Sequence, residues 1–411
     1  MAEILTTADG RPLKAALQAA QARAKRRAFW LVAPLLLFVL LTFVAPIGQM
    51  LVRSAHNDGF SAHMPRLTAW FAANPGAADD AAWEALALDL QDSAVAKTSG
   101  IVGTRVNYEL SGTRSLFTST ARKAKDFAPP YREALLKADK DWDDPALWGV
   151  MRQVSQAYSG NFFLAAADLA RDADGTIVQV PEDRRVYVNL FVKTFVLAGV
   201  ITLTCLILAY PVAHLLATLP MRWSNLLMIL VLLPFWTSLL VRTTSWMVLL
   251  QQQGVINNMM VAAGIIGEDG RIAMMYNQTG TIIAMTHILL PFMILPLYSV
   301  MKTIPPSYAR AARSLGATSW TTFRRIYLPQ TLPGIGAGSL LVFILAVGYY
   351  ITPALVGGAS GQLISNLIAF HMQDSLNWSL AAALAAILLA LVLVLYWLYD
   401  RLIGIDNLKL G

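Results

Sequence analysis

The sequence is short of charge and of cysteine. Charged residues make up 14% of its 411 residues, whereas a soluble domain usually carries about a quarter. That is too little charge to cover a water-soluble protein of this size, and 56% of the residues are hydrophobic. The single cysteine excludes an intramolecular disulfide. These shortages exclude disordered, fibrous and nucleic-acid-binding proteins as the main interpretation and predict an integral membrane protein.

Signatures of enzymes and of ion-driven carriers are also missing. No Gly-Lys pair occurs, so there is no phosphate-binding loop and the chain is not expected to hydrolyse ATP itself. The five histidines are scattered, and we expect no metal site. Carriers driven by protons or sodium usually need a carboxylate inside the membrane. None of the acids after residue 185 lies in a long apolar run: Glu268, Asp269, Asp374, Asp400 and Asp406.

Long hydrophobic runs are abundant. A helix needs about 20 apolar residues to cross a bilayer. The runs that meet or approach this length are 29–52, 186–219, 226–250, 279–301, 332–352 and 379–399. We therefore expect an all-α membrane protein with six transmembrane helices, the first of them (29–52) an uncleaved anchor.

Lysine and arginine in the short loops indicate the orientation. With the N-terminus inside, the cytoplasmic segments hold 14 basic residues against 4 acidic ones, whereas the short outer loops hold one basic residue and three acidic ones. The inner segments are 1–28, 219–225, 302–328 and 400–411, and the outer loops are 251–278 and 353–378. The sequence thus predicts a cytoplasmic N-terminal tail at 1–28 and a cytoplasmic C-terminus at 405–411.

Most of the charge lies in one insertion between the first two runs. Residues 53–185 hold 33 of the 57 charged side chains, and this length suffices for one small domain. We expect a mainly helical extracytoplasmic domain. Helices are predicted after Asp79-Asp80, where apolar residues recur from Trp83 to Leu90, and over 146–158, and a turn and short strand over 174–180. Tryptophans supply bulk for its core: Trp70, Trp83, Trp142 and Trp148.

The basic segment between the fourth and fifth runs carries a specific pattern. Pro305-Pro306 ends the fourth run, and Ser307 is expected to cap a short helix. Gly316 is expected to end that helix as the first residue beyond it. A second short helix is expected over 319–326, before Pro329. The sequence therefore predicts a compact helix–turn–helix across the cytoplasmic end of the bundle.

This segment resembles the coupling loop of ABC importer permeases. The family pattern is Glu-Ala-Ala-x-x-x-Gly followed by Ile-x-Leu-Pro, and the matching residues here are Arg310-Ala311-Ala312, Gly316 and Ile326-Tyr327-Leu328-Pro329. Arg310 stands where the family usually has Glu. The resemblance implies that the loop at 304–329 docks into a groove on an ATPase subunit. The expected coupling residues are Tyr308, Arg310, Ala311, Ala312, Arg313, Leu315, Gly316 and Ala317.

Residues 186–404 resemble one branch of these permeases, that of the spermidine/putrescine-type importers. The stretches that carry this resemblance are Tyr210-Pro211-Val212-Ala213, 233–243 with Trp246, 348–355, 366–368 and 377–378. It implies a type I ABC importer fold in the bacterial inner membrane, with a five-helix permease core at 186–404. The insertion at 53–185 is not covered by the resemblance.

The resemblance also implies partners. They are a second permease, expected to be a different chain, two ATPase subunits that bind ATP and magnesium, an extracytoplasmic solute-binding protein and the membrane lipid. This chain would then be no enzyme, would bind no cofactor or nucleic acid, and would move a small polar solute inward by alternating access. The insertion would either extend the platform for the binding protein or brace the second permease. The alternative is a membrane-anchored sensor or scaffold with an extracytoplasmic domain.

The residues define the substrate less clearly than they define the family. The candidate path residues are Trp236, Arg242, Thr243, Trp246, Tyr349, Tyr350 and Thr352. Aromatic ring faces attract cations, although aromatic residues in membrane spans more often serve packing or interface anchoring. Arg242 would favour an anion. A polyamine-like cation is preferred because of the family resemblance.

Overall fold

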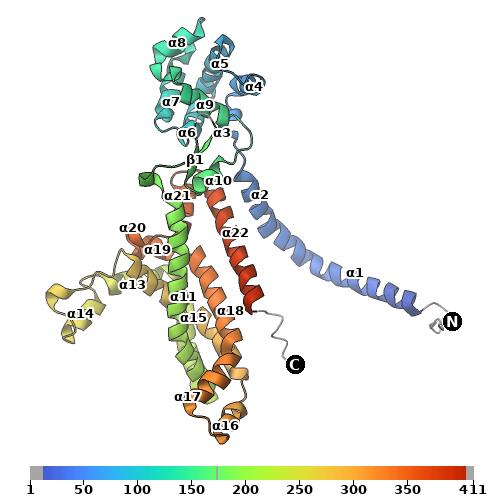
Figure 1. Ribbon diagram of the computed structural model, residues 1–411, viewed down its shortest axis with the longest axis vertical. Helices are drawn as coiled ribbons and strands as arrows, with labels where there is room; N and C mark the ends of the chain where they lie inside the picture. The colour runs from blue at the N-terminus through green and yellow to red at the C-terminus, as the bar shows by residue number, and fades with distance from the viewer. Residues whose placement is uncertain (1–12, 173–174, 404–411) are drawn as a thin grey trace. The chain divides into compact units, whose positions relative to one another are not determined.

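The computed structural model describes residues 13–172 and 175–403, and most of these residues lie in helices (Figure 1). The chain divides into two compact units, and the boundary follows Arg53. The first contains α1 (Leu13–Val39), a π-helical turn (Leu40–Val44) and α2 (Ala45–Arg53). Its residues 20–53 are apolar and long enough to cross a membrane, and they include the predicted first span. Residues 1–12 of the predicted tail and the predicted C-terminus at 405–411 lie outside the described residues.

The second unit begins with the insertion, which consists mainly of short helices. The helix predicted from Trp83 is confirmed, and Asp79 caps it by accepting a hydrogen bond from Ala82 N–H at 2.9 Å. The helix predicted at 146–158 is also confirmed, although it ends at Val154. The elements are α3 (Asp58–Ser61), α4 (Pro65–Ala73), α5 (Asp80–Ala96), α6 (Ser99–Asn107), α7 (Thr113–Lys123), α8 (Tyr131–Ala138), α9 (Pro145–Val154), α10 (Asn161–Ala166), β1 (Leu169–Arg171) and β2 (Ile177–Gln179).

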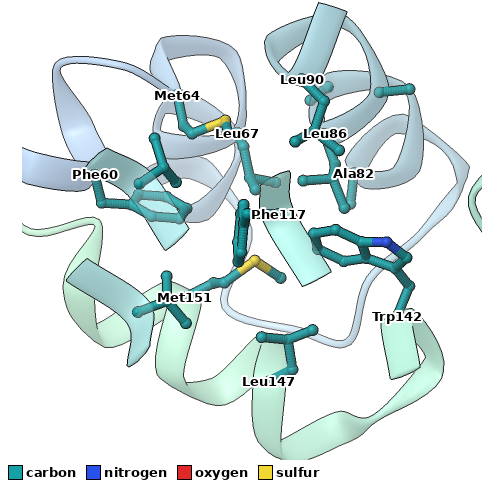
Figure 2. Packing of buried hydrophobic residues seen from close by; sticks show 14 of the residues in the cluster. Phe60, Met64, Leu67, Ala82, Leu86, Leu90, Phe117, Trp142, Leu147 and Met151 are labelled. Atoms are coloured by element: carbon teal, nitrogen blue, oxygen red, sulfur yellow. The ribbon is translucent and has the colours of Figure 1, made fainter. Parts of the chain in front are cut away.

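These helices enclose a hydrophobic core of their own (Figure 2). Trp142 has no exposed surface, donates its indole N–H to Thr120 Oγ1 at 3.0 Å and packs edge-on against Phe117. Trp70 and Trp83 are buried in the same core, and Trp148 packs against it. The predicted tryptophan core is therefore confirmed.

One carboxylate is buried among these helices and fixes α4 to α5. Asp89 of α5 has no exposed surface and accepts hydrogen bonds from the backbone N–H groups of Arg66 and Leu67 in the first turn of α4, at 3.3 and 2.9 Å. These donors have no partner within their own helix. Desolvation raises the pKa of Asp89 above its ordinary value, although the two backbone hydrogen bonds and the Arg66 guanidinium oppose the shift.

The insertion is joined to the helices that follow it by apolar packing and by one carboxylate. Phe162 and Ala166 of α10 share a buried cluster with Phe191, Ile364 and Leu384. Asp168, just after α10, accepts three hydrogen bonds from the first N–H groups of the long helix α11. The last part of the insertion is thereby held against the start of α11.

The remaining helices include the long apolar ones. They are α11 (Tyr187–Thr218), α12 (Met221–Leu232), α13 (Leu239–Leu250), α14 (Val255–Ala262), α15 (Gln278–Thr303), α16 (Pro306–Ser314), α17 (Ser319–Thr322), α18 (Leu328–Gly348), α19 (Ile351–Val356), α20 (Gly358–Gly361), α21 (Ile364–Gln373) and α22 (Trp378–Ile403). Within the described ranges, five helices are long and apolar enough to cross a membrane, or six spans if one bent pair counts as one.

That bent pair corrects the third predicted span, which was a single helix over 226–250. The chain turns by 97° between the helical stretches 221–236 and 239–262. Pro234 lies in a 3₁₀ turn before the bend and lacks a backbone N–H. Thr237 is extended, and Ser238 starts a new helix by accepting a hydrogen bond from Val241 N–H at 3.2 Å. The apolar run is continuous in sequence, but the helix is not.

Helices α11, α15 and α18 pack around a shared apolar core. Their approach depends on two glycines one helical turn apart on α18. A methyl group at Gly338 would lie 2.7 Å from Met293 Sδ, and one at Gly334 would lie 3.1 Å from the Pro296 carbonyl oxygen. Small residues at this spacing let two helices pack closely inside a membrane.

Candidate coupling site

The predicted helix–turn–helix is present, and its turn is closed by backbone hydrogen bonds. α16 ends at Ser314, and Gly316 follows with a φ of +88°, in the left-handed region. Gly316 N–H donates to the Arg313 carbonyl at 3.0 Å, and Ala317 N–H donates to the Ala312 carbonyl at 3.1 Å. This pair of bonds is the Schellman arrangement that ends many helices at a glycine. The predicted role of Gly316 in the backbone is confirmed.

The start of α16 differs from the prediction. Ser307 does not cap it: the helix begins at Pro306, Pro305 takes the cap position and no side chain accepts a capping hydrogen bond. Proline is well suited to the first helical position because its missing N–H would have no partner there. The second helix does have a side-chain cap, since Thr318 Oγ1 accepts from Thr321 N–H at 3.2 Å.

A column of aromatic rings connects the turn with α11. Trp320 stacks on Phe323, and Phe323 stacks on Tyr327, with ring centroids 5.7 and 6.4 Å apart. The Tyr327 hydroxyl lies 3.0 Å from His214 Nδ1. On the same side, Tyr210 of α11 packs edge-on against Phe323. The rings therefore form a continuous packed contact between the second short helix and α11.

Sequence reasoning did not identify this column. Its signal was the spacing of the aromatic residues at 320, 323 and 327, which places them on one face of a helix. The π-helical turn at Phe323–Tyr327 keeps these residues continuous with α18. His214, one of the five scattered histidines, lies in α11 and makes its hydrogen-bond contact with the last ring of this column.

The outer surface of the two short helices is apolar at its tip and basic beside it. Leu315 is 90% exposed and Trp320 is 67% exposed. A groove of 690 Å³ between this turn and the ends of α11 and α15 is lined by Lys302, Arg310 and Arg313, and the described lining includes no acid. We name these two short helices, Pro306–Thr322, the hairpin. None of these three cations forms an ion pair within the described residues, and exposed apolar side chains rimmed by polar ones are typical of a surface that a partner covers.

The structure does not bring the predicted path residues together. Thr243 of α13 and Thr352 of α19 do meet: both are fully buried, and their hydroxyl oxygens are 3.3 Å apart. Trp246 donates its indole N–H to His287 Nδ1 at 3.0 Å. Trp236, at the bend, is 90% exposed.

The other predicted path residues lie in different surroundings. Tyr349 packs against the core of α11, α15 and α18, whereas Tyr350 is 40% exposed and lines a groove beside α21. Arg242 Nε is buried and has no hydrogen-bond partner among the described residues. The role of these residues in a translocation path stays a prediction.

Comparison with known proteins identifies the family. Residues 206–403 match the family described as "Binding-protein-dependent transport system inner membrane component". The "Spermidine/putrescine transport system permease protein PotB" of Escherichia coli strain K12 is 38% identical over 221 residues, which are 53% of this chain and 80% of that protein. This chain belongs to the binding-protein-dependent ABC importer permeases.

Two further relatives agree with this assignment. PotB of Haemophilus influenzae is 35% identical over 252 residues, which are 59% of this chain and 87% of that protein. The "Inner membrane ABC transporter permease protein YdcU" of Escherichia coli strain K12 is 30% identical over 230 residues, which are 54% of this chain and 73% of that protein.

Membership in the family confirms the predictions about membrane location, transporter class and catalysis. The chain is a multi-pass inner-membrane permease of a binding-protein-dependent ABC importer, and such permeases have no catalytic activity of their own. The insertion lies before the residues that match the family. The geometry of the insertion must therefore be interpreted from this chain itself.

Proposed function

We propose that this ABC importer permease moves a small organic cation of the polyamine type inward, driven by ATP hydrolysis on separate ATPase subunits. The PotB relatives are named as spermidine/putrescine permeases, and this similarity supports the choice of substrate. The complete complex contains this chain, a second and different permease, two ATPase subunits that bind ATP and magnesium, and an extracytoplasmic solute-binding protein.

The hairpin is the element through which the ATPase acts. Its exposed tip at Leu315 and Trp320 enters a groove on the ATPase. When the two ATPases close, the stacked rings transmit the movement of the hairpin to α11. The tight glycine turn keeps this tip compact. ATP binding then opens the bundle outward and its hydrolysis resets the bundle, which is alternating access. The single observation that carries the proposal is this exposed turn, which is joined to α11 through the rings of Phe323 and Tyr327.

Arg310 indicates what the ATPase must offer to the hairpin. Arg310 is exposed, forms no ion pair among the described residues, and shares its groove with two other cations. The facing surface should therefore be acidic or present carbonyl oxygens at a helix C-terminus.

Charge reversal by Arg310→Glu tests this expectation. The variant should bind the ATPase about tenfold more weakly at low salt, because an attractive contact becomes a repulsive one. Copurification of the ATPase at several salt concentrations measures the effect, and the loss should shrink as salt rises because salt screens exposed charges. Undiminished binding of Arg310→Glu at low salt would refute the contact.

The orientation of the chain is also part of the proposal: both termini are cytoplasmic, and the insertion at 53–185 faces outward. Cys205 is the single cysteine and is buried, so the natural chain is a suitable background for cysteine labelling. In intact spheroplasts, Ser115→Cys in the insertion should react with a membrane-impermeant maleimide, whereas Ser314→Cys in the hairpin should react only after permeabilisation. Both serines are exposed in the structure. The opposite labelling pattern would reverse the orientation.

Uptake of labelled spermidine tests the substrate. Cells that lack their own polyamine importers and express the complete complex should accumulate spermidine, and excess putrescine should compete whereas excess sulfate should not. The matched control carries the same complex with a catalytically dead ATPase. Accumulation that is equal with both ATPases, or that is absent with a well-assembled complex, would overturn the proposed substrate.

A further inference from the structure

We infer that the groove between α19 and α21 is a binding site for a primary ammonium group of the transported solute, with Asp374 as its anionic ligand. The inference rests on the proposed polyamine-type substrate. The groove has a volume of 480 Å³, within the range of small-molecule sites. It is separate from the hairpin and from the residues that were predicted to form the path, apart from Tyr350.

The lining of this groove has the chemistry that an alkylammonium ion requires. One carboxylate (Asp374) and two aromatic rings (Tyr350 and Phe370) lie beside three primary amides (Gln362, Asn366 and Gln373), and the described lining includes no basic residue. Ammonium groups bind to carboxylate and amide oxygens and are attracted to the faces of aromatic rings. A hydrated metal ion would gain nothing from the two rings, whereas an organic amine would contact them.

Asp374 is available for such a ligand. Its carboxylate forms no ion pair or hydrogen bond with any residue that the structure describes. The other acids in the loops between the spans differ from it. Glu268 is paired with Arg271 at 2.8 Å, and Asp269 follows it in the same exposed turn. Of the three acids in the short loops 251–278 and 353–378, Asp374 is the one that lines a described groove.

The groove is held in shape by hydrogen bonds that leave its ligand groups free. Asn366 donates to the Tyr350 carbonyl at 2.7 Å and accepts from Leu363 N–H at 3.0 Å, so it connects α21 to the segment before α19. At the other end of α21, His371 lies 3.1 Å from the Tyr187 hydroxyl and 2.9 Å from Ser375 Oγ. A preformed site of this kind loses less entropy when it binds a ligand.

Apolar residues complete the fit to an aliphatic amine. Leu367 and Ala369 of α21 line the same groove, together with Ala354 of α19. These side chains can contact the methylene groups of a polyamine while Asp374 binds one ammonium group and the aromatic rings attract another. A sugar or an inorganic anion would match neither the charge nor the apolar lining.

Direct binding of labelled spermidine to the membrane complex of the two permeases and the ATPases in nanodiscs, without ATP and without the binding protein, tests the site. Asp374→Asn should weaken binding about tenfold, because a hydrogen-bonded ion pair is replaced by a neutral contact. Phe370→Leu should weaken it about threefold through the loss of one ring face. Asp374→Glu should restore most of the affinity, and Asp269→Asn should behave as the natural chain does.

The outcomes separate this site from the proposed substrate. Spermidine binding that depends on Asp374, in an importer that fails to accumulate spermidine, would support the site and overturn the substrate. Uptake and binding that Asp374→Asn leaves within twofold of the natural chain would overturn the site and leave the substrate standing. No measurable binding to the natural importer, under conditions in which it transports spermidine, would also overturn the site.

Discussion

Replacing Gly316 with leucine should lower solute uptake at least about tenfold, while the complex still assembles and its ATPase subunits still hydrolyse ATP. The reason is the backbone. Gly316 has a φ of +88°, and a side chain in this region costs about 1–2 kcal/mol, which corresponds to about a tenfold change in the population of the turn. A change in the turn displaces Leu315 and Trp320, and with them the ring column that leads to α11.

Two control substitutions separate the effect of the position in the hairpin from the cost of placing a side chain in the left-handed backbone region. A β-carbon at Gly316 would have no atom within 4 Å, and the same holds for Gly264, whose φ is +68°. Gly264→Leu therefore has a similar backbone cost away from the hairpin and should leave uptake close to that of the natural chain. Gly316→Asn should retain more uptake than Gly316→Leu, because asparagine tolerates the left-handed region. Normal uptake by Gly316→Leu would remove the coupling role from this turn.

Removing the Asp168 carboxylate should destabilise the connection between the insertion and the bundle by about 3 kcal/mol. Asp168 is 5% exposed and accepts hydrogen bonds from the N–H groups of Val186, Tyr187 and Val188, at 3.1, 3.1 and 2.8 Å. Asp168→Ala leaves these donors at the start of α11 without a buried acceptor. It also removes a negative charge from the positive end of a 32-residue helix.

Thermal unfolding of the purified complex measures this loss, and the midpoint should fall by about 5 °C. Asp168→Asn should be milder, because its amide oxygen can still accept and asparagine tolerates the residue's φ of 55°. Asp183→Ala is the matched control, since Asp183 is an exposed acid in the same connection. An equal fall of the unfolding midpoint in Asp168→Ala and Asp183→Ala would show that the Asp168 carboxylate does not stabilise the connection between the insertion and α11.

Features encoded by neighbouring residues could be predicted from the sequence. Asp79 before α5 and Gly316 after α16 each act within a few residues of the position they stabilise, and both were expected. The family could also be recognised, because the motif at 310–329 is local and its spacing is specific.

Features that depend on distant contacts could not be predicted. Asp168 acts on N–H groups 18 to 20 residues further along the chain, and nothing in its immediate sequence marks it as a helix cap. The bend after Pro234 was missed because hydropathy is the same on both sides of it, and proline also occurs inside continuous membrane helices. In α15, for example, Pro291 and Pro296 lie within one unbroken helix.

The candidate cation site shows the same limit. Asp374 was noted as an acid outside the spans, but its neighbours in the groove come from α19, α21 and the segments that flank them. Asn366 and His371 attach the two ends of α21 to distant segments by hydrogen bonds, and Tyr350 and Asp374 line one cavity beside it. Sequence spacing could not place these residues together.

The most direct test of the central claim is ATP-dependent spermidine import by the reconstituted complex. Proteoliposomes that contain this permease, its partner permease and the ATPases should take up spermidine only when ATP lies on the side of the hairpin and the loaded binding protein lies on the side of the insertion. ATP hydrolysis should rise when the loaded binding protein is added. Spermidine import without ATP would contradict the account. Import that proceeds while the rate of ATP hydrolysis stays the same with and without the binding protein would also contradict it.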